Sequence, residues 1–143
     1  MTVKTILSAK GGDLISIEPT ATLDAAVKTL AKHRIGALLV LGPDRRVIGI
    51  LSERDIVRVL AEQGADVLTK PLAQVMTRKV VTVGPTEAVG VIMERMTTGK
   101  FRHVPVVEQE QVVGIISIGD VVKHRLHERE KESAALRDYI QTA

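Results

Sequence analysis

The sequence predicts an α/β (α+β) fold made of two tandem repeats of β-α-β-β-α type, packed as a pseudo-twofold pair. Two internal repetitions are the basis of this prediction. The segment Ile15–Thr20 recurs as Val81–Thr86, and the segment Val47–Val57 recurs as Val112–Val122 in the same order. Self-similarity at a fixed spacing is typical of chains built from repeated supersecondary units. We therefore expect each half of the chain to form the same small unit.

The order of elements within each unit follows from hydrophobic spacing. Apolar residues at roughly helical intervals predict a helix over 23–35 in the first unit and over 89–96 in the second. Two short apolar runs follow each helix, as expected of buried strands: Ala37–Leu41 and Val47–Leu51, then Val104–Val107 and Val112–Ile116. A second helix then starts near Asp55 and near Asp120, and the first of these ends at Gly64, which suits a left-handed cap.

The predicted organisation is a single module over 1–143, with repeats at 8–64 and 74–126 and an extended C-terminal helix over 120–141. That helix would be about 30 Å long at the usual rise per residue. Its middle is polar, whereas its end carries an apolar stripe: Ala134, Leu136, Tyr139 and Ile140. An exposed apolar stripe favours a partner surface, so we predict a homodimer.

The composition excludes several classes of protein. Cysteine is absent, which removes disulfides, thiolate zinc sites and cysteine nucleophiles. The chain has no run of about 18 apolar residues, and residues 1–10 lack the apolar core of a signal peptide, so we expect a cytoplasmic protein with no membrane partner. Only Phe101 and Tyr139 are aromatic, which leaves almost nothing on which nucleic-acid bases could stack.

Both units end in the same short motif of a glycine, two apolar residues, a serine, two variable residues and an aspartate. It reads Gly49-Ile-Leu-Ser-Glu-Arg-Asp55 in the first unit and Gly114-Ile-Ile-Ser-Ile-Gly-Asp120 in the second. Together with the Pro-Thr pair near the start of each unit, this doubled motif resembles the CBS domain family, named after cystathionine beta-synthase, over nearly the whole chain. The resemblance implies a stand-alone pair of repeats, called a Bateman module, with two clefts that bind AMP, ADP, ATP or NAD(H).

The resemblance also implies roles for the residues of the motif, and their chemistry is consistent with those roles. Asp55 and Asp120 would each accept two hydrogen bonds from a ribose diol. Ser52 and Ser117 lie just before helices, where free backbone amides and the helix dipole favour a phosphate. Gly119 would let the backbone approach the ligand closely.

The second unit has basic residues near its motif that the first unit lacks. By similarity to the family, three side chains would face phosphates in the second cleft: Lys100, Arg102 and His103. The first unit has Gly36 and Ala37 at the matching positions, and its Glu53 would repel phosphate. We therefore expect unequal clefts, with the more highly charged ligand bound beside Ser117 and Asp120.

The remaining cleft walls follow from the same resemblance. The adenine would lie against main chain just before the first strand of each unit, within 10–15 and 76–81. The expected wall residues are Lys10, Asp13, Ile15, Gly36, Ala37, Lys79, Val81 and Ile116.

Simpler interpretations of the same residues stay open. A serine followed three residues later by an acid is also a helix-capping box, worth about 1 kcal/mol without any ligand. His124 and His127 share a helix face, but no third metal ligand is identifiable, so we expect no metal site. The sequence contains no nucleophile paired with a base, no phosphate loop and no dinucleotide fingerprint, so we expect no enzyme.

The favoured function is a regulatory sensor of an adenine nucleotide, which acts by a ligand-dependent conformational change of a dimer and is read by an unknown protein partner. A second hypothesis is a ligand-free dimerisation scaffold, which nucleotides would not stabilise against heat. A third is nucleic-acid binding, suggested only by the isoelectric point of about 9.4. The net charge is only +3, and such binding would weaken steeply with salt.

Overall fold

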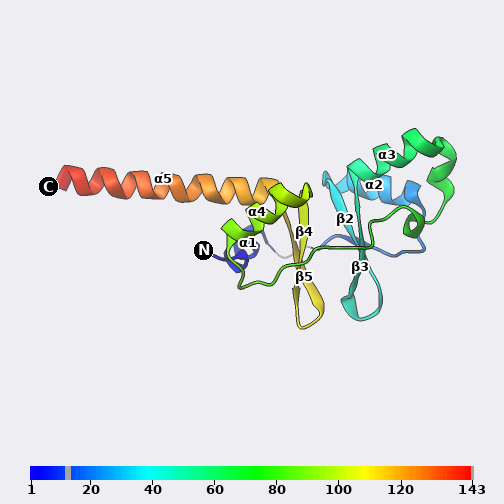
Figure 1. Cartoon of the computed structure of the whole chain (residues 1–143), viewed down its shortest axis with the longest axis horizontal. Helices are drawn as coiled ribbons and strands as arrows, with labels where there is room; N and C mark the ends of the chain where they lie inside the picture. The colour runs from blue at the N-terminus through cyan, green and yellow to red at the C-terminus, as the bar shows by residue number, and fades with distance from the viewer. Residues whose placement is uncertain (12–13, 143) are drawn as a thin grey trace.

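The computed structural model describes residues 1–11 and 14–142 and contains two units of similar build that lie side by side (Figure 1). The first unit consists of β1 (Ser16–Ile17), α2 (Leu23–His33), β2 (Ala37–Leu41), β3 (Val47–Ser52) and α3 (Glu53–Gln63). The second consists of α4 (Val89–Gly99), β4 (His103–Glu108), β5 (Gln111–Ser117) and α5 (Ile118–Thr142). The predicted α/β fold of two repeats is therefore confirmed.

Each unit contains a small sheet, and the two sheets have equivalent registers. In the first, β2 pairs in parallel with β1 and antiparallel with β3, with Ala37 opposite Ser52. In the second, β4 pairs antiparallel with β5, with His103 opposite Ser117. The strand expected at the start of the second unit is reduced to a single parallel bridge from Val83 to β4. In both units the serine of the motif therefore lies opposite the first residue of the preceding strand, β2 in the first unit and β4 in the second.

Local backbone conformation fixes where the helices start and stop. Thr22 Oγ1 accepts a hydrogen bond from Ala25 N at 3.2 Å and so caps the start of α2. Helix α3 ends before Gly64, whose φ is 77°, a conformation that favours glycine. Arg34 and Lys100 end α2 and α4 with φ of 54° and 57°. These two equivalent turns send the chain directly into β2 and β4.

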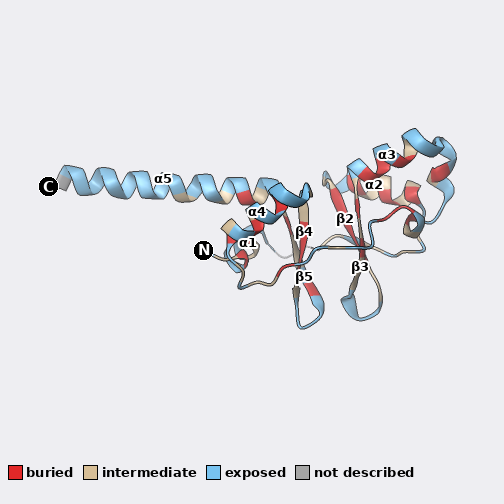
Figure 2. Cartoon of the chain, viewed as in Figure 1, coloured by how far each residue is buried: buried red, intermediate tan, exposed pale blue. Residues whose placement is uncertain are grey.

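The first hydrophobic core is completed by residues that follow the first unit in the sequence (Figure 2). Leu23 and Leu51 are fully buried in this core. Packed against them are two short 3-10 helices, η2 (Ala65–Thr69) and η3 (Leu72–Gln74), which contribute the fully buried Val67 and Leu72. The segment between the units therefore belongs to the first core.

The second core is completed by a helix at the opposite end of the sequence, α1 (Val3–Lys10). Val3 and Ile6 are 0% and 5% exposed and lie in one cluster with Ile92 and Ile116. Val3 N also donates a hydrogen bond to Glu87 O at 3.0 Å. This helix and its partner were not predicted from the sequence. Each core is thus covered by the segment that precedes the other unit.

Because the segment after the first unit still packs on the first core, the chain crosses to the second unit only after that segment. Thr77 is tied to β3 by two hydrogen bonds with Ile50, at 3.0 and 2.9 Å, whereas Val83 is tied to β4. Residues 77–82, which we call the crossing segment, must therefore pass from one unit to the other. The crossing segment forms one wall of the site described below.

Helix α5 starts on the second core and then leaves the body of the protein. Val121 is 1% exposed, but every side chain from Arg129 to Gln141 is exposed (Figure 2). Over the part of the chain that the structure describes, no helix is long and apolar enough to cross a membrane.

Candidate functional site

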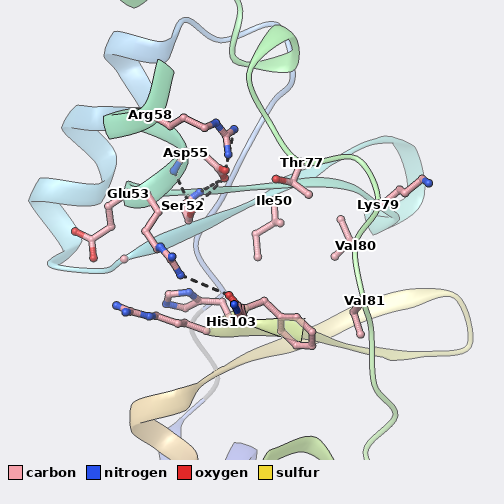
Figure 3. A pocket seen from close by; sticks show the side chains of 15 residues that line it. Ile50, Ser52, Glu53, Asp55, Arg58, Thr77, Lys79, Val80, Val81 and His103 are labelled. Carbon is pink, nitrogen blue, oxygen red and sulfur yellow. Dashed lines mark hydrogen bonds and ion pairs between the residues drawn. The ribbon is translucent and has the colours of Figure 1, made fainter. Parts of the chain in front are cut away.

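A cavity of about 450 Å³ lies between the two units, and we call it the seam cavity (Figure 3). Its volume is in the range of small-molecule binding sites. Its lining comes from four parts of the chain: the turn before β2, the β3–α3 junction, the crossing segment and the turn that leads into β4. The lining residues are Gly36, Ile50, Ser52, Glu53, Arg54, Asp55, Arg58, Thr77, Lys79, Val80, Val81, Lys100, Phe101, Arg102 and His103. The motif of the first unit therefore faces residues of the second unit.

Asp55 is the only buried acidic side chain among the described residues, with the residue 7% exposed. It forms a reciprocal cap with Ser52: Asp55 N donates to Ser52 Oγ at 3.2 Å, and Ser52 N donates to Asp55 Oδ2 at 3.0 Å. The capping interpretation is therefore correct. Asp55 Oδ1 instead faces Arg58 Nη2 at 3.3 Å, from a side chain that is 59% exposed. A carboxylate has about four acceptor positions, and Ser52 N and Ser52 Oγ take two of them on Oδ2, so a ligand's hydroxyls would bind Oδ1 in place of the exposed Arg58.

Basic side chains outnumber acidic ones around the seam cavity. Its cationic residues are Arg54, Arg58, Lys79, Lys100 and Arg102, whereas its carboxylates are Glu53 and Asp55. Figure 3 shows the Lys79 ammonium turned away from Asp55. The positive end of the dipole of α3, an 11-residue helix, lies on the same side, although Glu53 N and Asp55 N already donate to Gly36 O and Ser52 Oγ. This arrangement favours a ligand that carries several negative charges and at least one pair of hydroxyls.

His103 lies between the two motifs. Burial lowers the pKa of its imidazole, and the nearby Lys10 ammonium lowers it further, while the carboxylates of Glu53 and Asp120 act in the opposite direction. The net effect is a pKa below the ordinary value of about 6.5. His103 is therefore neutral at pH 7 and can become a cation when an anion binds beside it.

We expect the affinity of the seam cavity for inorganic triphosphate to rise about threefold as the pH falls below 6.5, because a bound anion stabilises protonated His103. The gain should level off once the pH passes below the lowered pKa of the free protein, since His103 is then protonated in both states. Titration calorimetry across this range measures the effect. His103→Gln should show only the pH dependence that comes from the triphosphate itself. An equal dependence in both proteins would contradict the prediction.

The second motif has the same cap but a different partner. Ser117 N donates to Asp120 Oδ2 at 2.9 Å, and Asp120 N donates to Ser117 Oγ at 3.1 Å. Lys10, at the end of α1, donates to Asp120 Oδ2 at 2.7 Å and to Ile115 O at 2.9 Å. Burial by itself raises the pKa of Asp120, but the hydrogen bonds from Lys10 and Ser117 outweigh it and lower the pKa. The second carboxylate is thus already paired with a cation of the chain.

The structure corrects the expected position of the basic residues. Lys100, Arg102 and His103 line the seam cavity beside Asp55, whereas we expected them to serve the cleft of Asp120. The reason is the pseudo-twofold arrangement, in which the turn before β4 reaches across to the motif of the other unit. A hydrogen bond from Arg54 Nη1 to Lys100 O at 3.5 Å spans this junction.

The expected wall residues divide into two groups. Gly36, Lys79 and Val81 line the seam cavity, and a side-chain carbon at Gly36 would lie 2.9 Å from Glu53 Oε1. Ile15 instead packs against the first core, and Ala37 is buried at 6% exposure.

Ile116 is not a cleft wall, because it is fully buried in the second core. Neighbouring residues of a strand point to opposite faces, so the residue beside it, Ile115, occupies the position that Ile50 has in the first unit. At Gly119 a side-chain carbon would meet only Ser117 Oγ, at 3.6 Å, so a larger residue would fit there. Lys10 lies at the second motif, and Asp13 falls outside the described residues.

Thr77 and Val80 lie within the expected stretch 76–81, whereas the sequence did not single out four other residues of the seam cavity: Ile50, Arg54, Arg58 and Phe101. A signal existed for Arg58, which lies three residues after Asp55 and therefore on the same face of α3. No local pattern indicates the others, because they meet across the junction of two units. Within the described residues, no three His, Asp or Glu side chains gather in a way that could hold a metal ion.

A pair of like units, each with a serine–aspartate cap, and a cavity between them define a tandem-repeat module. The CBS domain profile matches residues 3–62 and 72–127, so the chain belongs to the CBS domain family. It is 34% identical over 148 residues to the mitochondrial CBS domain-containing protein CBSX3 of Arabidopsis thaliana, covering 98% of this chain and 72% of that protein.

Two solved structures extend this similarity to the fold. The CBS-domain containing protein ATU1752 from Agrobacterium tumefaciens is 44% identical, with a TM-score of 0.84 over 87% of this chain and 99% of that one. The CBS domain protein PAE2072 from Pyrobaculum aerophilum, solved in complex with AMP, is 31% identical, with a TM-score of 0.75 over 84% of this chain and 89% of that one. Proteins of this fold thus include an adenine-nucleotide binder.

Proposed function

We propose that this protein is a regulatory module that binds an adenine nucleotide in the seam cavity and does not transform it. The observation that carries the proposal is that a buried carboxylate, Asp55, lines a cavity of about 450 Å³ in which basic side chains outnumber acidic ones. An acceptor for a ribose diol and a cationic surround for phosphates are the two requirements of a nucleotide. The AMP complex of PAE2072 supports the adenine.

The lining suggests how the nucleotide lies. Ile50, Val80 and Val81 form an apolar wall that suits the adenine ring (Figure 3). Asp55 would hold the ribose, and the start of α3 together with Arg102 would hold the phosphates. The cavity also contains Glu53, whose carboxylate limits how many phosphates can lie next to it.

The two clefts should bind ligands unequally, in the reverse order from the sequence expectation. Cationic side chains outnumber carboxylates in the seam cavity, so we expect the more highly charged ligand beside Asp55. In the second cleft a ribose must compete with Lys10 for Asp120, which weakens binding there. Regulation further requires that the nucleotide bind two states of the protein with different affinity, and we propose that a homodimer provides them.

Titration calorimetry with adenosine, AMP, ADP, ATP and NADH tests the proposal, combined with thermal unfolding. We expect two unequal sites, and a ligand at 100 times its Kd should stabilise the fold by about 2.7 kcal/mol. If no adenine compound binds or stabilises the protein, the module is a scaffold and the proposal is wrong.

Arg102→Gln should weaken ATP binding about fivefold and leave adenosine binding nearly unchanged. The exposed guanidinium contributes about 1 kcal/mol through a screened contact with phosphate, and adenosine has no phosphate. Arg45→Gln is the matched control, since it removes the same charge from the exposed turn between β2 and β3. An equal loss of adenosine and ATP binding would place Arg102 beside the nucleoside and contradict the assignment.

A further inference from the structure

Helix α5 exposes an apolar stripe that no other described residue of the chain covers. Val122, Leu126, Leu136 and Ile140 are 42%, 57%, 60% and 64% exposed. Figure 1 shows the outer part of this helix extending away from both units. An isolated helical segment of such length is only marginally stable in water, so an uncovered stripe is costly.

The stripe has the spacing of a coiled coil. Starting at Val122, residues on one face recur at alternating intervals of four and three: Val122, Leu126, Arg129, Ser133, Leu136 and Ile140. An average interval of 3.5 residues is what two helices need in order to wind around each other. The buried Val121 points to a different face, so the stripe is open to another helix.

The charges beside the stripe select the direction of pairing. In a parallel pair, Arg125 lies opposite Glu130 of the second copy, and Glu132 lies opposite Arg137 of the second copy. Twofold symmetry forms each attractive pair twice. In the antiparallel pair that places Leu126 on Leu136, the glutamates at 130 and at 132 would instead face their own equivalents, which is repulsive.

We propose that α5 associates with α5 of a second copy as a parallel, two-stranded coiled coil over residues 122–140. Arg129 and Ser133 form a polar layer in the middle of the stripe. Polar residues at such positions fix the register and the number of strands at some cost in stability. Arg129 would lie next to Glu130 of the second copy, and the carboxylate of Glu130 would offset the positive charge of Arg129. This inference does not rest on nucleotide binding.

Disulfide trapping tests the direction of pairing, because the chain has no cysteine of its own. In the parallel pair the two copies of residue 140 face each other, so Ile140→Cys should cross-link completely under mild oxidation. In the antiparallel pair residue 140 faces 122, about 27 Å from its equivalent at the usual helical rise. Ala135→Cys, on the opposite face of α5, is the matched control and should cross-link at least tenfold more slowly. Absence of the Ile140 cross-link, or equal rates for both variants, overturns the proposal.

Sedimentation equilibrium provides an independent measurement. The unmodified protein should be a dimer, and Glu132→Arg should raise its dimer dissociation constant at least fivefold by placing arginine opposite Arg137. The double variant Glu132→Arg, Arg137→Glu should restore the original constant. If neither variant changes the constant, α5 is not the interface. Both side chains are exposed and neither lines the seam cavity, so nucleotide binding can be scored separately in the same samples.

Discussion

Replacing Asp55 by alanine is expected to lower the affinity of the seam cavity for AMP and ATP by more than a hundredfold. Hydrogen bonds to a charged group contribute about 1.5–3 kcal/mol each, and the ribose diol would lose two of them. A loss of about 3 kcal/mol corresponds to more than two powers of ten in Kd. Titration calorimetry measures the change directly. A variant that keeps the original affinity would show that Asp55 is only a capping residue.

A control is needed because Asp55→Ala also removes a helix cap. Thr22→Ala removes a cap from α2, where Thr22 Oγ1 accepts from Ala25 N, and Thr22 does not line the seam cavity. We expect this control to lower the free energy of unfolding by about 1 kcal/mol and to leave the nucleotide affinity unchanged. Asp120→Ala should affect only the weaker second site, since Lys10 already occupies that carboxylate.

Replacing Ile6 by alanine is expected to lower the free energy of unfolding by about 2–5 kcal/mol. Ile6 is 5% exposed and packs in the second core, although the whole first unit separates it from that core in the sequence. The alanine variant leaves a cavity that the surrounding side chains cannot fill completely. Urea unfolding followed by circular dichroism gives the free energy.

Val57→Ala is the matched control for Ile6→Ala, because Val57 is 66% exposed. This surface substitution should change the free energy of unfolding by less than about 0.5 kcal/mol. A similarly small effect for Ile6→Ala would mean that α1 is not part of the second core.

Sequence reasoning recovered the elements whose patterns are local. The run Ala37–Leu41 reads as a buried strand because all of its residues are apolar, and it forms β2. Helix α1 was not predicted, although Val3, Ile6 and Leu7 have helical spacing. The same spacing recurs at Leu72, Val75 and Met76. A stripe of three residues is too short to indicate a partner, and the partner of α1 lies most of the chain away.

The candidate site was predictable only in part, for a related reason. The serine and aspartate of each motif are adjacent in sequence, so the capping geometry followed directly. The position of Lys100 to His103 could not be predicted in the same way, because it depends on how the two units meet. Ile116 was assigned to a cleft although the alternation of side chains along β5 turns it into the core.

The crossing segment has a consequence for any motion between the units. Thr77 is fixed to β3 and Val83 to β4, so a rotation of one sheet relative to the other must be absorbed by the backbone of residues 78–82 on this side of the molecule. Lys79, Val80 and Val81 belong to that short hinge and also line the seam cavity. A ligand bound in the seam cavity therefore contacts the residues whose backbone dihedral angles must change when one sheet rotates relative to the other.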